Sequence, residues 1–251
     1  MKVSSSDAML HFIFTLDVER NWSPGIYPEK PDYSTIRKVV PEILEQFKDS
    51  KIRGTFFITG EVAKNNESLV RTIAKGHEIA VHTHPYEHKN FPPHEREKDL
   101  LANYKFEEQL SMVSRDKSVL DRFYDCVSFR SGKLSSNDDT LSVIRALGFK
   151  IDSSKNIKMP LSVLKYFPQK TRGILRIHPC FDPSRITLAE FQRKLKFLKV
   201  LSRTGNVFCT LLSHPSMFDN VENFERFKSI TDYIAKEKFN SMALEDAYKM
   251  I

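Results

Sequence analysis

Cysteine and long apolar runs are both scarce in this chain. Its 251 residues include three cysteines, Cys126, Cys180 and Cys209, each isolated in an apolar context. An odd number of cysteines without metal-pair spacing argues against a disulfide framework and favours buried thiols in a reducing compartment. No apolar run approaches the roughly 18–20 residues that span a bilayer. His11 and Asp17 interrupt the amino-terminal run before it reaches signal-peptide length. We therefore expect a cytoplasmic protein without a transmembrane segment.

Linkers, repeats and shifts of composition are also missing. No stretch rich in proline, glycine and serine divides the chain, so we expect one domain over residues 1–251. Hydrophobic residues make up 40% and charged residues 28%, which excludes a disordered or fibrous protein. The net charge is +7, but the lysines are spread along expected helices, which predicts a solvated basic surface. We expect no nucleic-acid partner, and the composition leaves peripheral membrane contact open.

Short apolar runs alternate with longer amphipathic stretches along the whole chain. The runs predict strands at 10–16, 53–59, 77–81, 126–130, 149–152, 174–178, 207–213 and, more weakly, 240–244. The amphipathic stretches predict helices at 33–49, 61–75, 95–120, 138–147, 187–203 and 222–237. Seven or eight strand-and-helix units predict an α/β fold with a parallel sheet, and we expect this sheet to close into a barrel.

Polar, reactive residues follow most of the expected strands at their carboxyl ends. They are Asp17, Glu19, His82, His84, Arg130, Asp152, His178 and His214. In a parallel barrel the carboxyl ends of the strands form the active-site face. The sequence therefore predicts that these side chains meet at one mouth.

Two carboxylates leave the first expected strand together. In FTLDVE, residues 14–19, a period of two places Asp17 and Glu19 on one side. Neighbouring carboxylates repel each other, and they coexist most readily when a cation or a proton lies between them. The alternative interpretation is a helix cap or a solvated loop.

Histidines are concentrated in GHEIAVHTHPYEHKN, residues 76–90, which holds His77, His82, His84 and His88. Two imidazoles and one carboxylate with an open position form a common catalytic site for zinc or iron. Three ligand pairs are open: His82 and His84 on one strand face, His84 and His88 one helical turn apart, or His82 and His88 through a loop. We expect His77 to be structural, because it lies far from the strand's carboxyl end.

Arg130 and His214 complete the set of candidate catalytic residues. A guanidinium beside a carboxylate lowers its pKa and orients it through hydrogen bonds. Imidazole suits proton donation near neutral pH. Together with a metal that polarises a carbonyl and activates water, these residues predict hydrolysis of an amide or ester. In this scheme Asp17 takes the proton from water and His214 protonates the leaving amine, so no serine or cysteine nucleophile is needed.

Four segments resemble the motifs of the polysaccharide deacetylases, the NodB-homology carbohydrate esterases of family 4 type. They are RGTFFITGEVAKNNESLVRTIAKGHEIAVHTH at 53–84, FRSGKLSSNDDTLSVIRALGFKIDSS at 129–154, LLSHP at 211–215 and FTLDVE at 14–19. They follow the family order from about residue 12 to 215. The resemblance implies a distorted (β/α)7–8 barrel, one divalent metal, usually zinc or another transition metal, and removal of acetyl groups from a sugar or glycoconjugate.

The resemblance also assigns roles, with two departures from the common pattern. It makes Asp17 the base, Arg130 its partner and His214 the acid. Glu19 stands where branches with a D-x-E motif have a metal ligand, because Val18 replaces the usual second aspartate. The family's second histidine normally follows His82 by four positions, where this chain has tyrosine. We therefore expect His84 to replace that ligand, with His88 in reserve.

Four other points stay open from the sequence. An amidase of the same fold acting on a non-sugar C–N bond would use the same site. A barrel that binds glycan or nucleic acid without catalysis is the alternative of another class. His178 either lines the cleft or is structural, and Trp22 and Tyr27 either stack on a sugar ring or pack within their loop.

Overall fold

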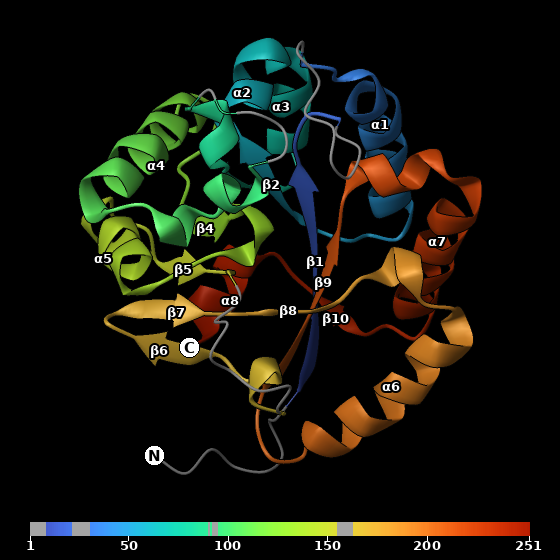
Figure 1. The fold of residues 1–251 in the computed structure, drawn as a ribbon. Helices are drawn as coiled ribbons and strands as arrows, with labels where there is room; N and C mark the ends of the chain where they lie inside the picture. Colours follow the sequence, from blue (N-terminus) through green and yellow to red (C-terminus); the bar gives the residue numbers. More distant parts are fainter. Residues whose placement is uncertain (1–8, 22–30, 90, 92–94, 155–162) are drawn as a thin grey trace.

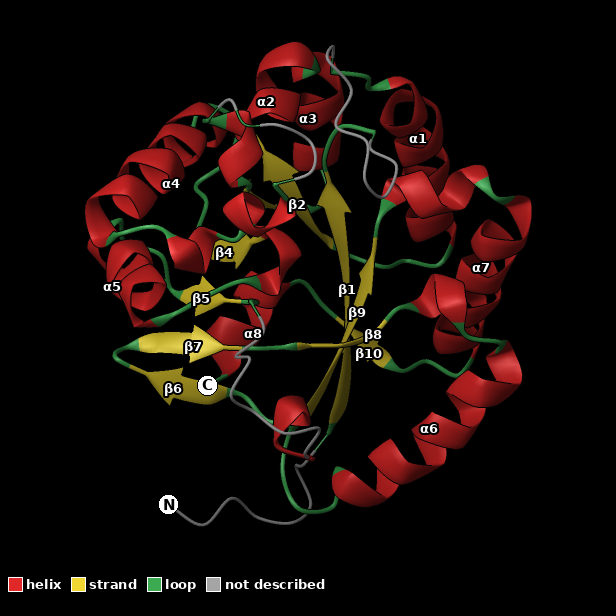
Figure 2. Ribbon diagram, viewed as in Figure 1, coloured by secondary structure: helices red, strands yellow, loops and turns green. Residues whose placement is uncertain are grey.

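The computed structural model describes residues 9–21, 31–89, 91, 95–154 and 163–251. The strands are β1 (Leu10–Val18), β2 (Thr55–Thr59), β3 (Glu78–Thr83), β4 (Ser128–Ser131), β5 (Ile151–Asp152), β6 (Gln169–Thr171), β7 (Ile174–Arg176), β8 (Pro179–Phe181), β9 (Val207–Ser213) and β10 (Asn240–Ser241). The α-helices are α1 (Ser34–Asp49), α2 (Gly60–Asn65), α3 (Glu67–Ala74), α4 (Phe106–Leu120), α5 (Asp138–Ala146), α6 (Leu188–Leu201), α7 (Val221–Lys236) and α8 (Leu244–Met250). In Figures 1 and 2 helices α1 to α7 surround most of the strands, while β6 and β7 lie at an edge without a helix outside them.

The strands form one curled sheet in the order β6-β7-β5-β4-β3-β2-β1-β9-β8, with β10 beside β1. Every pairing is parallel except that of β6 with β7. At one edge β7 pairs with β5, at the other β8 pairs with β9, and residues 174–181 form both strands in direct succession. Figure 1 shows this segment running across the centre of the view. The chain itself therefore bridges the two edges, and the expected α/β fold with a distorted parallel barrel is confirmed.

The two faces of β1 explain how the barrel is packed. Phe14 points outward, where its ring lies 5.6 Å from that of Phe47 in α1 and 6.1 Å from that of Phe227 in α7. Ile13 points inward and belongs to a second apolar cluster with Phe57 of β2. Both faces of the strand are thus buried, as expected for a central strand of a parallel sheet. The same alternation carries Asp17 to the inner face, four residues beyond Ile13.

Helix α8 closes the floor of the barrel. Its Leu244 and Ala247 pack into the inner cluster. Two backbone N–H groups at its start are satisfied from the sheet: that of Leu244 donates to Oγ1 of Thr55 at 3.0 Å, and that of Glu245 to Oε2 of Glu78 at 3.0 Å. The inner apolar cluster and α8 therefore fill the barrel on the side away from the carboxyl ends of the strands.

Several expected elements differ from those observed. The helix expected at 95–120 begins at Phe106, because 96–99 and 101–103 form 3₁₀ turns in which Asp99 is bonded to groups of the preceding segment. The helix expected at 61–75 breaks at Asn66, whose φ of −140° and ψ of 45° are not helical. Within the run at 174–178 only Ile174–Arg176 forms a strand, β7, and β8 begins after the run at Pro179. Strand β6 pairs with β7 through a turn with Arg172 at φ 52° and Gly173 at φ 85°. Within the described ranges, no helix is long and apolar enough to cross a membrane.

Candidate metal and catalytic site

Neighbouring strands bring the candidate residues to one end of the barrel. His82 lies opposite Thr59 on one side and opposite Arg130 on the other, so β2, β3 and β4 are in register at the mouth. Asp17 ends the inner face of β1, and Ser213 of β9, which precedes His214, lies opposite Leu16. Because all these strands are parallel, their carboxyl ends converge at the same edge.

Arg130 and Asp17 form a buried ion pair. Nη1 of Arg130 donates to Oδ1 of Asp17 at 2.6 Å, and both residues are almost completely buried. Nη2 donates to Oγ1 of Thr15 at 3.0 Å and to Oγ of Ser153 at 2.8 Å, while the guanidinium carbon lies 3.9 Å from the centre of the Phe57 ring. Burial raises the pKa of Asp17, but the charge of Arg130 and the nearby histidines outweigh it, so the pKa is lowered. Asp17 is therefore an oriented carboxylate.

Glu19, His82 and His84 place three ligand atoms within reach of one ion. Nε2 of His84 lies 2.8 Å from Oε2 of Glu19, and Nε2 of His82 lies 3.9 Å from the same oxygen. The two Nε2 atoms lie 3.2 Å apart. Ligands at about 2.0–2.1 Å from a tetrahedral metal are roughly 3.3 Å from each other. The spacing of the three atoms therefore fits a divalent metal.

The far nitrogens of the two imidazoles fix the tautomers that a metal requires. Nδ1 of His82 lies 2.8 Å from the carbonyl oxygen of Arg130, which can only accept, so this Nδ1 carries a proton. Nδ1 of His84 likewise donates to Oδ2 of Asp99 at 3.1 Å. In the neutral state both Nε2 atoms are then acceptors, and both face the carboxylate of Glu19. Three acceptors that face one another are compatible with a cation between them.

The pKa shifts of His84 and Glu19 both favour the charged forms of these side chains. Burial lowers the pKa of His84, but the carboxylates of Glu19 and Asp99 raise it well above the usual 6.5. Burial opposes ionisation of Glu19, yet the neighbouring histidines lower its pKa to about 2. The environment therefore favours positive charge next to Glu19.

His214 completes the site from the solvent side. Its Nε2 lies 3.7 Å from Oδ2 of Asp17 and 3.9 Å from Oε1 of Glu19, and its side chain is 32% exposed, whereas the side chains of His82 and Glu19 are 2% and 5% exposed. It follows β9 and precedes a 3₁₀ turn at Pro215–Asp219. His214 is thus the imidazole at this mouth that solvent and an incoming substrate can reach.

The other histidines singled out from the sequence lie apart from the cluster. His88 contacts Oδ2 of Asp116 through Nε2 at 3.0 Å, so the reserve role expected for it does not fit this geometry. His77 accepts the Gly54 N–H at 3.1 Å and its ring lies 5.6 Å from that of Phe47, which agrees with a structural role. His178 contacts the carbonyl oxygen of Ser154 through Nδ1 at 2.8 Å.

Two further predictions concern residues around the mouth. Asp152 is the last residue of β5 and pairs with Arg176 at 3.1 Å instead of facing the candidate ligands, because Ile151 and Ser153 on either side of it take the inward positions. Trp22 and Tyr27 lie outside the described residues.

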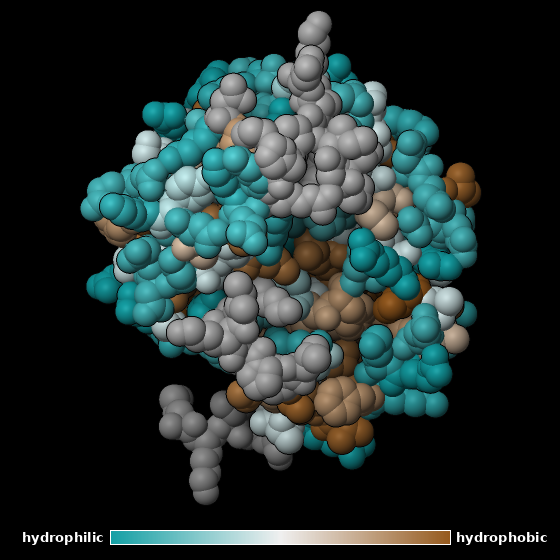
Figure 3. Space-filling model, viewed as in Figure 1, coloured by the Kyte–Doolittle hydropathy of each residue, from teal (hydrophilic) through white to brown (hydrophobic). Residues whose placement is uncertain are grey.

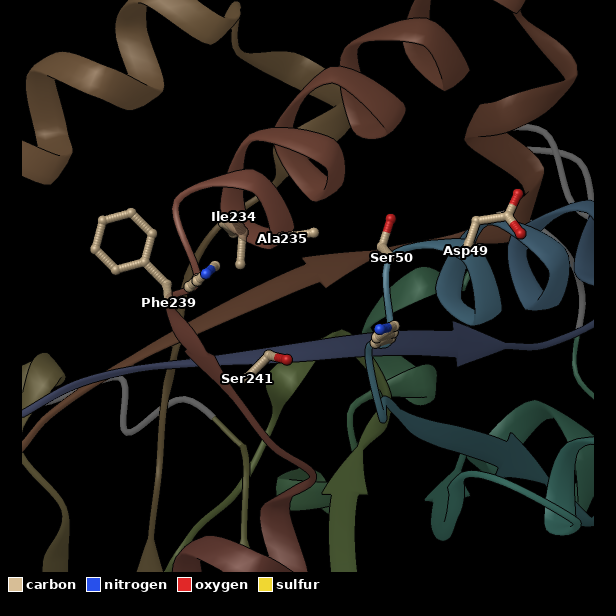
Figure 4. Close-up of a pocket in the computed structure, with 8 residues that line it drawn as sticks. Asp49, Ser50, Ile234, Ala235, Phe239 and Ser241 are labelled. Atoms are coloured by element: carbon tan, nitrogen blue, oxygen red, sulfur yellow. The ribbon is translucent and has the colours of Figure 1, made fainter.

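Figure 3 shows a largely hydrophilic face with apolar residues gathered near its centre and along its lower rim. The hollow in Figure 4, of about 330 Å³, lies elsewhere, where α1 and α7 end beside β10. Its lining residues are Asp49, Ser50, Lys51, Ile234, Ala235, Lys238, Phe239 and Ser241, and they include none of the candidate catalytic residues.

Sequence reasoning missed three residues that hold His84 in place. Asp99 accepts from its Nδ1, and Lys133 lies 3.1 Å from the same carboxylate oxygen. A Cβ added to Gly132 would lie 2.4 Å from the His84 ring, so only glycine fits there. Gly132 and Lys133 follow Arg130 in the segment FRSGKL, whose pattern predicts a role for the arginine alone. Asp99 carried no signal, because it fell within the expected helix at 95–120.

A curled parallel barrel with carboxylates, imidazoles and a buried arginine at its mouth is the architecture of a barrel enzyme. Residues 30–151 match the family model described as polysaccharide deacetylase. This segment is therefore similar to the polysaccharide deacetylases, and the match confirms the resemblance drawn from the motifs. The family supports the expected enzyme class, a hydrolase of carbon–nitrogen bonds other than peptide bonds. Asp17, Glu19 and His214 lie outside the matched residues.

Solved structures share the fold at low sequence identity. A presumed polysaccharide deacetylase from Mycobacterium smegmatis is 18% identical with a TM-score of 0.74, over 99% of this chain and 92% of that one. The PuuE allantoinase is 13% identical with a TM-score of 0.65, over 96% and 90%. A carbohydrate esterase family 4 pseudoenzyme from Bacillus anthracis is 12% identical with a TM-score of 0.55, over 98% and 66%. The fold is thus shared by proteins of different activity, and function must be argued from the site.

Proposed function

We propose that this protein is a metal-dependent deacetylase that hydrolyses the acetamido group of an N-acetylated sugar or glycoconjugate. The observation that carries the proposal is the placement of two acceptor nitrogens, of His82 and His84, against the carboxylate of Glu19, beside an arginine-paired Asp17. The acetylated sugar is suggested by the family whose model residues 30–151 match.

Zinc is the metal we propose, because two imidazoles and one carboxylate with further positions open are ligands typical of catalytic zinc. When bound, the ion supplies a Lewis acid for the amide carbonyl and lowers the pKa of water from about 15.7 towards about 7. Glu19, His82 and His84 would hold it. Another transition metal with the same ligands would serve the same purpose.

Asp17 is the proposed base. Its Oδ1 is occupied by Arg130, which leaves Oδ2 to accept a proton as water adds to the carbonyl carbon. Oδ2 lies between His82, at 3.8 Å from Nε2, and His214, at 3.7 Å. Because Arg130 lowers the pKa of Asp17, the carboxylate is ionised and ready to accept.

His214 is the proposed acid. As the C–N bond breaks, the nitrogen of the amide needs a proton, and Nε2 of His214 faces the same space from the solvent side. The products are acetate and the free amine of the sugar. The partial exposure of His214 allows it to exchange protons with solvent between turnovers.

A substrate screen tests the proposal. Protein loaded with zinc is incubated with a panel of N-acetylated sugars and glycoconjugates and, separately, with small linear and cyclic amides. Acetate release from the sugars, lost in Asp17→Asn, is the expected result. Hydrolysis confined to the small amides would instead identify an amidase of this fold, and no hydrolysis with glycan retention would identify a binding protein.

A further inference from the structure

Asp99 contacts His84, one of the proposed metal ligands, from a segment that carries none of these ligands. It is fully buried at the end of the 3₁₀ turn Arg96–Asp99. Its Oδ2 lies 3.1 Å from Nδ1 of His84 and 3.1 Å from Nζ of Lys133, and its Oδ1 accepts the backbone N–H of Tyr86 at 3.2 Å. Among the described residues, the two partners other than His84 come from the segments that follow β3 and β4. The carboxylate is therefore held in place independently of the histidine that it contacts.

We propose that Asp99 is the positioning residue of His84, which fixes its Nδ1–H tautomer and turns Nε2 toward Glu19 and His82. A carboxylate behind a ligating imidazole orients the ring and makes its inner nitrogen a better ligand. This inference rests on the proposed function, because it requires that the cluster binds a divalent ion.

Gly132 and Lys133, in the segment after β4, also hold the His84 ring and Asp99 in place. Gly132 lies against the His84 ring so closely that an added Cβ would stand 2.4 Å from two of its atoms. The next residue, Lys133, adopts a left-handed backbone conformation with φ 52°, which a lysine rarely adopts, and its Nζ reaches Asp99. One side of the ring is thus fixed by the glycine and its far nitrogen by the carboxylate, whose charge the lysine balances.

The chain contains a matched aspartate–histidine pair outside the cluster. His88 and Asp116 are joined through Nε2 and Oδ2 at 3.0 Å, a distance close to the 3.1 Å of His84 and Asp99. Asp116 is also buried, at 3% exposure. Neutralising Asp116 therefore perturbs a similar hydrogen bond without touching a proposed ligand, which makes Asp116→Asn the control for Asp99→Asn.

Zinc affinity of the purified protein, measured by competition with a chromophoric chelator, tests the inference. We expect Asp99→Asn and Asp99→Ala to weaken zinc binding by roughly 10- to 100-fold, and Asp116→Asn to bind as the wild type does. We also expect the visible absorption of bound Co²⁺ to change in both Asp99 variants, because a turned imidazole alters the ligand field. Thermal melts of the metal-free proteins establish whether each variant is folded. If Asp99→Ala does not fold, the isosteric Asp99→Asn alone tests the inference.

The outcomes separate this inference from the proposed function. If the wild type binds zinc and Asp99→Asn binds it equally well with an unchanged Co²⁺ spectrum, the positioning role is wrong and the proposed function stands. If Asp116→Asn weakens binding as much as Asp99→Asn, the effect is a general loss of structure and the positioning role is again wrong. If the wild type binds no zinc or Co²⁺, both proposals fail.

Discussion

Nη1 of Arg130 donates to Oδ1 of Asp17 at 2.6 Å, and this ion pair lies inside the barrel beside the proposed metal ligands. Arg130 in turn donates to Thr15 in β1 and to Ser153, which directly follows β5. The carboxylate is thereby oriented and kept ionised, with Oδ2 left for chemistry. The Arg130–Asp17 ion pair therefore affects both stability and function, because removing either partner would leave the other as a buried unpaired charge.

Replacing Arg130 with methionine should destabilise the protein by about 3–5 kcal/mol, since the charge of Asp17 would be left buried and unpaired. Urea denaturation of the metal-free protein measures this free energy of unfolding. Combining Arg130→Met with Asp17→Asn should restore part of the loss, because the unpaired charge is then gone. The control, Asp152→Asn, neutralises another buried carboxylate paired with an arginine. A double variant less stable than Arg130→Met would contradict the pairing.

Replacing His214 with glutamine should lower kcat by roughly 100- to 10,000-fold, the range for loss of a general acid. Zinc affinity should stay that of the wild type, because Nε2 of His214 lies outside the three-residue cluster and the side chain is 32% exposed. Parallel measurements of kcat and of zinc binding check both parts. Loss of zinc together with activity would make His214 a ligand instead of an acid.

Gly132→Ala should weaken zinc binding and lower the melting temperature, because the new Cβ would collide with the His84 ring. The matched control is Gly76→Ala, where an added Cβ meets nothing within 4 Å. Chelator competition and thermal melts compare the two variants. If Gly132→Ala bound zinc as tightly as Gly76→Ala, the ring would have more room than its contacts indicate.

Glu78 should make stability depend on pH. Burial raises the pKa of its carboxyl from 4.5 to about 7 in the folded protein, although Thr55, Ser128 and the Glu245 N–H donate to it. Between those pH values the folded protein retains a proton that the unfolded chain releases, so this group's contribution to stability falls as pH rises. The free energy of unfolding of wild type minus that of Glu78→Gln should therefore decrease from pH 4.5 to about 7 and then level off. A difference that is flat or that rises with pH would refute this.

The strand pattern predicted the placement of the candidate residues where the strand period governs it. It placed Asp17 and Glu19 on one face and His82 at the mouth, because alternation and parallel register follow from the backbone alone. It left His84 and His88 as alternatives, since the path of the chain after a strand depends on tertiary contacts. In the structure Asp99 and Gly132 hold the first of these beside Glu19, whereas Asp116 holds the second elsewhere.

The dependence of local structure on tertiary contacts also explains which other elements of the fold the sequence could predict. The strand β9 was predicted residue for residue at 207–213, because only Thr210 interrupts its apolar run before Ser213. The hairpin of β6 and β7 was not, because its turn begins with Arg172 in a left-handed conformation that usually signals glycine or asparagine. The start of α4 was misplaced because Asp99 serves His84 and not the helix.

The most direct test of the account is the dependence of acetate release on bound metal. The purified protein is stripped with a chelator, reloaded with zinc in measured amounts, and assayed on the best N-acetylated sugar while its metal content is determined. The account predicts that activity disappears on stripping, returns in proportion to zinc up to one ion per chain, and does not return in Glu19→Gln. Full acetate release by the stripped protein, or activity in Glu19→Gln equal to that of the wild type, would contradict it.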